Sequence, residues 1–348
     1  MPILMSALRA YALAVLLAVS SAAVAIMVVD AFDLPLRDPD GFLGPAYIRL
    51  PVIVLLFVVT DVVPRALFRR RPVVEVLRER YSPERAALVV VGLGAFYLSY
   101  VSYRNLKGAL PFARPRVLDG ELLALDRIMA LGNDPAVLLH GLLGTGVAAY
   151  LLSAVYLFYL GFVPLSLGAA LVWGRNVRTA AWYVTALCLN WILGAVSYYL
   201  VPSLGPVFVR PNRYADLPVT GVTALQEKLA TTRFEVLFDP TGAEGLAGVA
   251  GFASLHVSVV FTAALVAHRI GMHHFVHSSL WVFLALTMIA TAYFGWHYLI
   301  DIPAGLALGA GAVALAGRAT QSMGVAPAQV DVLDVPQPVA VPAGASSR

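Results

Sequence analysis

The chain has few charged residues and almost no cysteine, and both shortages restrict what it can be. Of its 348 residues only 13% are charged, 60% are hydrophobic, and the mean hydropathy is +0.80. A soluble domain of this length would have roughly twice that charged fraction. The composition therefore excludes a soluble globular protein and predicts an integral membrane protein. The single cysteine, Cys188, lies in an apolar run, which excludes a disulfide framework.

Several other signals are missing from the sequence. It has no internal repeat, no heptad run and no glycine-rich phosphate loop, so it predicts neither a solenoid, nor a coiled coil, nor a phosphate-loop nucleotide site. Four histidines between residues 268 and 277 are irregularly spaced, and we interpret them as part of a surface loop rather than a metal site. We expect no cofactor, no metal and no nucleic-acid partner.

Apolar runs long enough to span a bilayer recur along the chain. A transmembrane helix needs about twenty apolar residues, and the runs that approach this length are 6–29, 48–67, 86–103, 145–173, 179–201, 252–270, 278–296 and 298–317. The sequence thus predicts an all-α fold, a polytopic helical bundle with about eight transmembrane helices. The first run is interpreted as an anchor, although a small-residue stretch near its end also fits a cleaved signal peptide.

The runs divide the chain into three parts. We expect an N-terminal transmembrane hairpin over residues 1–84 and a membrane domain over residues 85–318. Residues 319–348 are rich in Ala, Pro, Val and Ser and have no long apolar run, so they predict a disordered cytoplasmic tail.

Basic residues indicate which helix ends face the cytoplasm. Arg69, Arg70 and Arg71 follow the second run, and further arginines continue to residue 85. Cytoplasmic loops are enriched in Lys and Arg, so we place this segment in the cytoplasm. With eight spans, segments 104–144 and 202–251 and the turn at residue 297 then face outward. We expect an integral protein of the plasma (inner) membrane, with its polar site on the outer face.

Two histidine clusters lie at this outer end. Ser254 and His256 open the sixth run, and His297 and Asp301 stand between the last two runs. Residues four apart share a helix face, so Asp301 can accept a hydrogen bond from His297 and strengthen its free nitrogen as a base or nucleophile. Ionisable groups at such depth are costly, which makes them a functional-site hypothesis. The alternative is that the histidines are interfacial residues bonded to backbone.

The order of these residues resembles a known enzyme superfamily. Ser-x-His, followed about forty residues later by His-x-x-x-Asp at the ends of apolar helices, is similar to the type 2 phosphatidic acid phosphatase superfamily. The likeness is closest to its inositol phosphorylceramide synthase branch, whose Pro-Ser-Leu-His and His-Tyr-x-x-Asp elements resemble Ala253–His256 and His297–Asp301. Tyr198–Pro206 is similar to that branch's Tyr-x-x-x-Pro-x-x-x-Pro element, and the likeness covers residues 100–316.

The resemblance implies a reaction on a lipid phosphate at the membrane surface. His297 would attack phosphorus and form a phosphohistidine, Asp301 would orient it, and His256 would protonate the leaving oxygen and then activate the acceptor. Ser254 would hold phosphate oxygens. The implied partners are a lipid phosphate, an acceptor and the bilayer.

The acceptor distinguishes the functions that remain open. An alcohol acceptor implies a headgroup phosphotransferase, for example of inositol phosphate from phosphatidylinositol. Water as acceptor implies a lipid phosphatase acting on phosphatidic acid or a polyprenyl (di)phosphate. A non-enzymatic membrane transporter or scaffold is the remaining alternative.

The phosphate-binding cations are where the sequence departs from the superfamily. Thr291 stands where the third motif has Arg, and Ser203 stands where the first motif, Lys-x6-Arg-Pro, would place Lys ahead of Arg210. The same spacing recurs upstream, at Lys107 and Arg114. Arginine forks match phosphate geometry, so we predict Lys107, Arg114 and Arg210 as substrate-binding residues.

The upstream pair belongs to a basic segment, residues 104–127, that we place on the outer side. Basic residues there run against the usual charge bias of outer loops, which favours an anionic headgroup site. The alternative is a solvated loop whose charge is balanced by Asp119, Glu121 and Asp126.

Overall fold

The computed structural model describes residues 2–39, 44–174 and 176–321, and these residues form helices and connecting segments without β-strands. The elements are α1 (Pro2–Ala10), α2 (Ala12–Ala31), α3 (Ala46–Arg69), α4 (Val73–Arg80), α5 (Pro83–Ala113), α6 (Asp119–Met129), α7 (Pro135–Leu143), α8 (Val147–Gly168), the π-helix η1 (Ala169–Trp173), α9 (Val177–Leu200), α10 (Pro206–Val209), the 3-10 helix η2 (Pro211–Tyr214), α11 (Gly221–Phe238), α12 (Leu255–Arg269), α13 (His274–Tyr293) and α14 (Asp301–Thr320).

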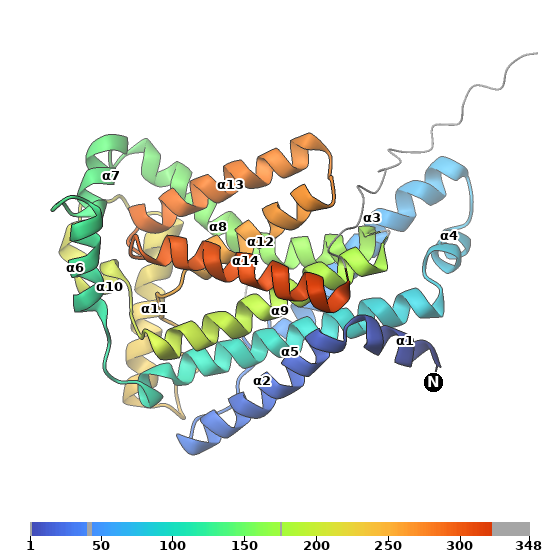
Figure 1. Cartoon of the computed structure of the whole chain (residues 1–348), viewed down its shortest axis with the longest axis horizontal. Coiled ribbons are helices and arrows are strands. Elements are labelled where there is room, and N and C mark those ends of the chain that lie inside the picture. The colour runs from blue at the N-terminus through green and yellow to red at the C-terminus, as the bar shows by residue number, and fades with distance from the viewer. Residues whose placement is uncertain (1, 40–43, 175, 322–348) are drawn as a thin grey trace, which may run out of the picture.

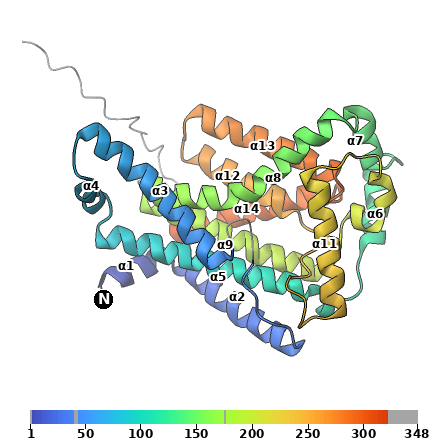
Figure 2. The same ribbon diagram turned by 180° about the vertical axis from the view of Figure 1, so that it is seen from behind.

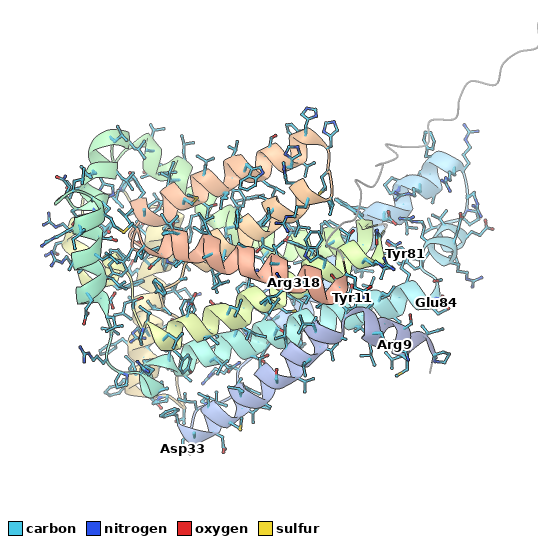
Figure 3. All side chains as sticks on the ribbon, viewed as in Figure 1. Arg9, Tyr11, Asp33, Tyr81, Glu84 and Arg318 are labelled. Carbon is cyan, nitrogen blue, oxygen red and sulfur yellow. The ribbon has the colours of Figure 1, made fainter. Side chains whose placement is uncertain are left out.

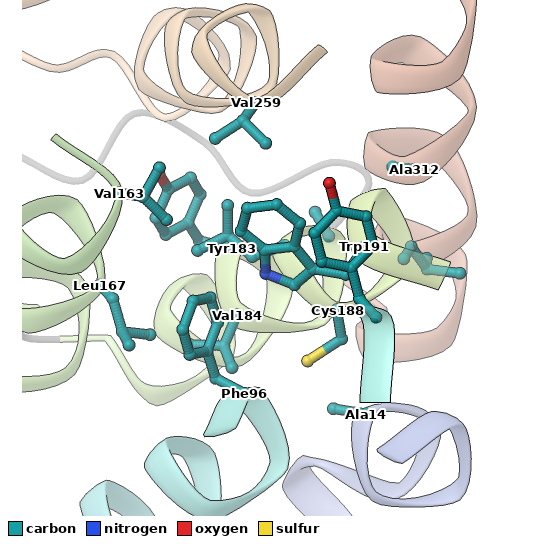
Figure 4. Close-up of a cluster of buried hydrophobic side chains, with 14 of the residues drawn as sticks. Ala14, Phe96, Val163, Leu167, Tyr183, Val184, Cys188, Trp191, Val259 and Ala312 are labelled. Atoms are coloured by element: carbon teal, nitrogen blue, oxygen red, sulfur yellow. The ribbon is translucent and has the colours of Figure 1, made fainter. Parts of the chain in front are cut away.

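The long helices pack side by side around α9 (Figure 1). Of the apolar part of α9, 78% is buried inside the protein, far more than in any other candidate span. Figure 4 shows the cluster at its centre, where Trp191 lies against Phe96 of α5, and Cys188 is fully buried among apolar neighbours. The indole of Trp182 donates to the carbonyl of Val313 on α14 at 2.9 Å. Helix α9 is therefore the structural core of the bundle.

Seven helices among the described residues are long and apolar enough to cross a membrane: α2, α3, α5, α8 with η1, α9, α13 and α14. This confirms the predicted all-α membrane bundle. The sixth predicted span, 252–270, differs in length, because α12 has only 15 residues and is about 22 Å long, short of the roughly 30 Å hydrocarbon core. The chain enters the bundle as an irregular segment, 244–254, before α12 begins.

Helix α5 is longer than its apolar run predicted. The run ended at residue 103, but the helix continues to Ala113 and has 31 residues. Arg104 and Lys107 are thus helical and partly buried rather than parts of an outer loop. Polar residues do not break a helix by themselves, whereas a residue that precedes proline, such as Arg114, disfavours helical geometry. The rest of the expected outer loop is also helical, as α6 and α7.

The two ends of the bundle differ in their charged residues and in the helices that lie across them. Helices α6, α7 and α11 lie across one end, and α4 with its arginines lies at the other (Figures 1 and 2). Figure 3 shows Tyr81 and Glu84, next to α4, at the end opposite to Asp33. At the α4 end the buried carboxylate of Asp61 accepts hydrogen bonds from Arg80 at 3.1 Å and from Tyr81 at 3.2 Å. The arginine-rich segment 69–85 therefore lies far from the α6–α7 end.

The domain division stays a prediction. Helix α2 of the expected N-terminal hairpin packs along α5 and α9. Helix α14 ends at Thr320, and residues 322–348 of the predicted disordered tail lie outside the described residues.

Candidate active site

His297 lies in the tight turn that joins α13 to α14. Gly295 adopts a φ of +66°, and an added Cβ would meet the ring of Tyr214 at 2.3 Å, so the turn needs glycine here. Asp301 begins α14, and its Oδ2 lies 3.1 Å from Nδ1 of His297. The same oxygen accepts the backbone N–H of Tyr298 at 2.9 Å. The i, i+4 pairing expected from the sequence is thus present, with the imidazole 4% exposed and the carboxylate fully buried.

His256 reaches the same place from the first turn of α12. Its Nδ1 lies 3.0 Å from Nε2 of His297, and its ring contacts those of Tyr156 and Tyr159, with centroids 4.8 and 4.5 Å away. Helix α12 can approach the start of α14 because Gly305 has no side chain, and a Cβ there would lie 2.5 Å from the carbonyl of Ser254.

The three side chains form one chain of hydrogen bonds, from Asp301 through His297 to His256. When the carboxylate accepts Nδ1–H of His297, the Nε2 of that ring carries a lone pair. That lone pair accepts Nδ1–H of His256. The only ring nitrogen of the pair that the chain leaves open is therefore Nε2 of His256.

A pocket opens onto His297 between α6, the start of α7 and the α10–η2 segment. Its walls include the guanidinium groups of Arg127, Arg210 and Arg213 and the carboxylates of Asp126 and Asp134. Arg213 lies 3.9 Å from Asp134. Within the described residues, Arg127 and Arg210 have no carboxylate within 4.0 Å. The structure thus places the predicted Arg210 at the histidines, together with two arginines that the motif comparison did not select.

Lys107 approaches the histidines from α5, inside the bundle. Its Nζ lies 5.3 Å from the centre of the Tyr198 ring on α9, and its charge acts on His256. Arg104 lies one turn earlier, and its Nε is buried with no hydrogen-bond partner among the described residues. Lys107 is therefore the α5 cation that lies near His256, and within the described part of the chain no carboxylate lies within 4.0 Å of its Nζ.

The structure does not bring Arg114 to this position. It is exposed at the end of α5, seven residues and about 10 Å further along the helix than Lys107. Ser254 is fully buried, and its Oγ accepts the backbone N–H of Val257 at 3.4 Å, so it caps α12. Both residues keep their predicted substrate-binding roles only as predictions.

Ser203, which stands in place of the expected lysine, has a structural role in the site. Its Oγ accepts the N–H of Phe252 at 3.0 Å, and its carbonyl accepts the N–H of Gly251 at 2.9 Å. These bonds hold the segment that leads into α12. A short polar side chain with a structural role therefore stands where the superfamily motif has a cation, and that Lys107 binds phosphate in its place stays a prediction.

Two carboxylates of α6 were not selected by the motif comparison. Asp119, 2% exposed, accepts the hydroxyl of Tyr298 at 2.7 Å, and Asp126, 4% exposed, accepts the N–H of Leu299 at 2.8 Å. Burial, with the charges of Asp301 and Asp134 acting in the same direction, raises the pKa of Asp126 to about 7, although its bond to Leu299 acts against this. The sequence alone indicates these acids only as the charge balance of a solvated loop.

The fold and the site define a class of protein: an integral membrane helical bundle with a buried Asp–His–His chain beside unpaired cations. A family model described as the PAP2 superfamily matches residues 120–315. The chain belongs to the PAP2 superfamily, which supports a function of the lipid phosphatase or phosphotransferase type. No curated protein and no solved structure matches the chain.

Proposed function

We propose that this protein is a lipid-phosphate phosphotransferase that forms a phosphohistidine at His297 and transfers the phosphate-bearing headgroup, inositol phosphate or a similar group, to an alcohol. The observation that carries this proposal is the hydrogen-bonded chain Asp301–His297–His256 beside the arginine-lined pocket. Covalent catalysis divides one difficult displacement into two easier ones.

In the first step the substrate phosphate replaces His256 as the partner of His297 Nε2, because that nitrogen is hydrogen-bonded in the resting site. The Nε2 lone pair attacks phosphorus, an N–P bond forms, and the P–O bond to the lipid breaks. His256, which takes up a second proton when the anionic phosphate binds, gives that proton to the departing oxygen. Asp301 stabilises the positive charge that develops on His297.

In the second step His256 acts as the base. It removes the proton of the acceptor hydroxyl, the acceptor oxygen attacks phosphorus, and the N–P bond breaks. Both histidines return to their starting states. General acid–base catalysis of this kind contributes roughly 10²- to 10⁴-fold in rate.

The cations supply the charge that phosphoryl transfer needs. Arg210 faces His297 from the pocket wall, and Lys107 lies on the His256 side. Arg127 would add a second guanidinium from α6. The carboxylates of Asp126 and Asp134 in the same walls are acceptors for hydroxyl groups, which supports a hydroxylated headgroup or acceptor rather than water alone.

The proposed site faces outward. Its end of the bundle carries α6, α7 and α11, whereas the arginine-rich α4 region lies at the opposite end. The positive-inside tendency assigns the α4 end to the cytoplasm, which supports a plasma-membrane enzyme that acts at the outer surface.

The test is a headgroup-release assay with the purified full-length protein in mixed phospholipid micelles, with and without acceptor alcohols. Transfer that requires the alcohol, is inhibited by vanadate and is lost in His256→Ala supports the phosphotransferase. Release without an alcohol identifies a lipid phosphatase instead. No vanadate-sensitive turnover of any phospholipid or polyprenyl phosphate would leave the transporter or scaffold as the function.

A further inference from the structure

Asp119, the first residue of α6, accepts several hydrogen bonds beside the turn that carries His297. Its two carboxylate oxygens accept the N–H of Leu204, each at 3.0 Å, and Oδ1 also accepts the N–H of Gly205 at 3.0 Å. The same Oδ1 accepts the hydroxyl of Tyr298 at 2.7 Å. One carboxylate therefore joins two segments that lie almost a hundred residues apart in the sequence.

Each of these segments is joined to one of the histidines, either along the chain or through hydrogen bonds. Tyr298 directly follows His297, and its backbone N–H donates to Oδ2 of Asp301, the oxygen that also binds the His297 ring. Leu204 and Gly205 follow Ser203, which holds residues 251 and 252 just ahead of α12 and His256. Asp119 is thus a common anchor for the His256 segment and the His297 turn.

Burying such an acceptor has a cost that its donors must offset. A buried carboxylate is tolerated only when hydrogen bonds satisfy it, and Asp119 is 2% exposed. Burial, reinforced by the hydrogen bond to Asp119 and its charge, raises the pKa of Tyr298. The phenol of Tyr298 therefore keeps its proton and stays the donor of this bond.

We propose that Asp119 is a positioning residue for phosphoryl transfer, acting through Tyr298 on the His297 ring and through the Leu204–Gly205 turn on the His256 segment. It touches neither histidine and is not itself a catalytic residue. The inference rests on the proposed phosphohistidine chemistry. A displacement of about 1 Å at a reacting group lowers rates about 10²-fold, so a loosened turn slows the attack step more than it weakens substrate binding.

The test is a double-mutant cycle of Asp119→Asn and Tyr298→Phe in the full-length protein. Tyr298→Phe removes only the hydroxyl that reaches Asp119. We expect phosphoenzyme formation, measured by rapid acid quench, and kcat to fall about 10- to 100-fold, with KM within about threefold. The double variant should be no slower than Asp119→Asn alone, because the neutral Asn amide has one oxygen left for the two backbone N–H groups and no longer holds the Tyr298 hydroxyl.

Tyr293→Phe is the matched control. Tyr293 is a fully buried tyrosine at the end of α13, and its hydroxyl donates to the carbonyl of Gly144 at 2.8 Å rather than to Asp119. It should keep the wild-type rate of phosphoenzyme formation. Equal losses in Tyr293→Phe and Tyr298→Phe would show a general packing effect and overturn the proposal.

Two more outcomes separate the proposals. A wild-type protein that never forms a phosphoenzyme contradicts the proposed function itself. A phosphoenzyme that forms in the wild type and at the same rate in Tyr298→Phe overturns the role of Asp119 alone. If Asp119→Asn does not fold, the rate in Tyr298→Phe decides, because that substitution retains the ring and its packing.

Discussion

The pocket carboxylate Asp126 makes stability and substrate binding depend on pH in a way that can be calculated. Its ordinary pKa is 3.8, and burial, together with Asp301 and Asp134, raises it to about 7 in the folded protein. Between these values the folded state holds a proton that the unfolded state has released. The free energy of unfolding therefore falls as pH rises from about 4 to about 7 and then levels off.

The perturbation is Asp126→Asn, which cannot ionise but keeps an oxygen to accept the N–H of Leu299. Ionisation of the buried Asp126 lowers the free energy of unfolding of the wild type at pH 8 by on the order of 4 kcal/mol at most, since one pKa unit corresponds to about 1.4 kcal/mol. We expect the variant to be more stable than the wild type at pH 8 and nearly equal to it at pH 4. Below pH 7 the protonated wild-type side chain also stops repelling a phosphate, so KM should rise above pH 7 only in the wild type.

The assay is thermal unfolding of the detergent-solubilised protein, followed by scanning fluorimetry from pH 4 to pH 8, with KM measured in parallel. Asp216→Asn, at an exposed position two residues after the pocket residue Tyr214, is the control for removing a negative charge. The reasoning is refuted if the difference in melting temperature between wild type and Asp126→Asn is the same at pH 4 and pH 8.

Three further predictions concern the nucleophile, the cations and the membrane orientation. His297→Ala removes the attacking nitrogen, so acid-quenched protein should carry no phosphoenzyme, and normal labelling would contradict the assignment. Arg210→Ala should lower turnover more than Arg114→Ala, because Arg210 lines the pocket and Arg114 lies exposed at the end of α5. The opposite order would favour the upstream pair, Lys107 and Arg114, as the phosphate-binding residues. In a cysteine-free background, Leu118→Cys should react with an impermeant thiol reagent in intact cells and Val73→Cys only after lysis, and the reverse pattern would place the site in the cytoplasm.

The helical bundle and the paired histidine and carboxylate were predictable from the sequence because they depend on local spacing. Hydropathy runs correspond closely to the long helices, since each span must satisfy its own backbone in lipid. His297 and Asp301 pair as expected, although His297 lies in the turn that leads into α14 and only Asp301 belongs to the helix. Helix α12 was predicted too long because the apolar segment 252–254 precedes it without being helical.

The acidic helix α6 was not predicted, because its role depends on partners distant in sequence. Asp119 and Asp126 have the composition of a solvated loop, and nothing local shows that their acceptors meet the turn after His297. The Lys107 and Arg114 spacing was similarly ambiguous. A helix continues through both residues, so they lie at different depths and only one comes near His256.

The sequence by itself determined that this is a membrane protein and where its helices run, and it selected His256, His297 and Asp301 as candidate catalytic residues. Hydropathy and helical periodicity are local properties, and a chain displays them before it folds. Only the tertiary structure decided which cations surround the histidines and which carboxylates hold them. The physical reason is that a guanidinium or carboxylate acts over a few ångströms in space, and the packing of α5, α6 and α9 sets those distances between residues that lie up to two hundred positions apart in the chain.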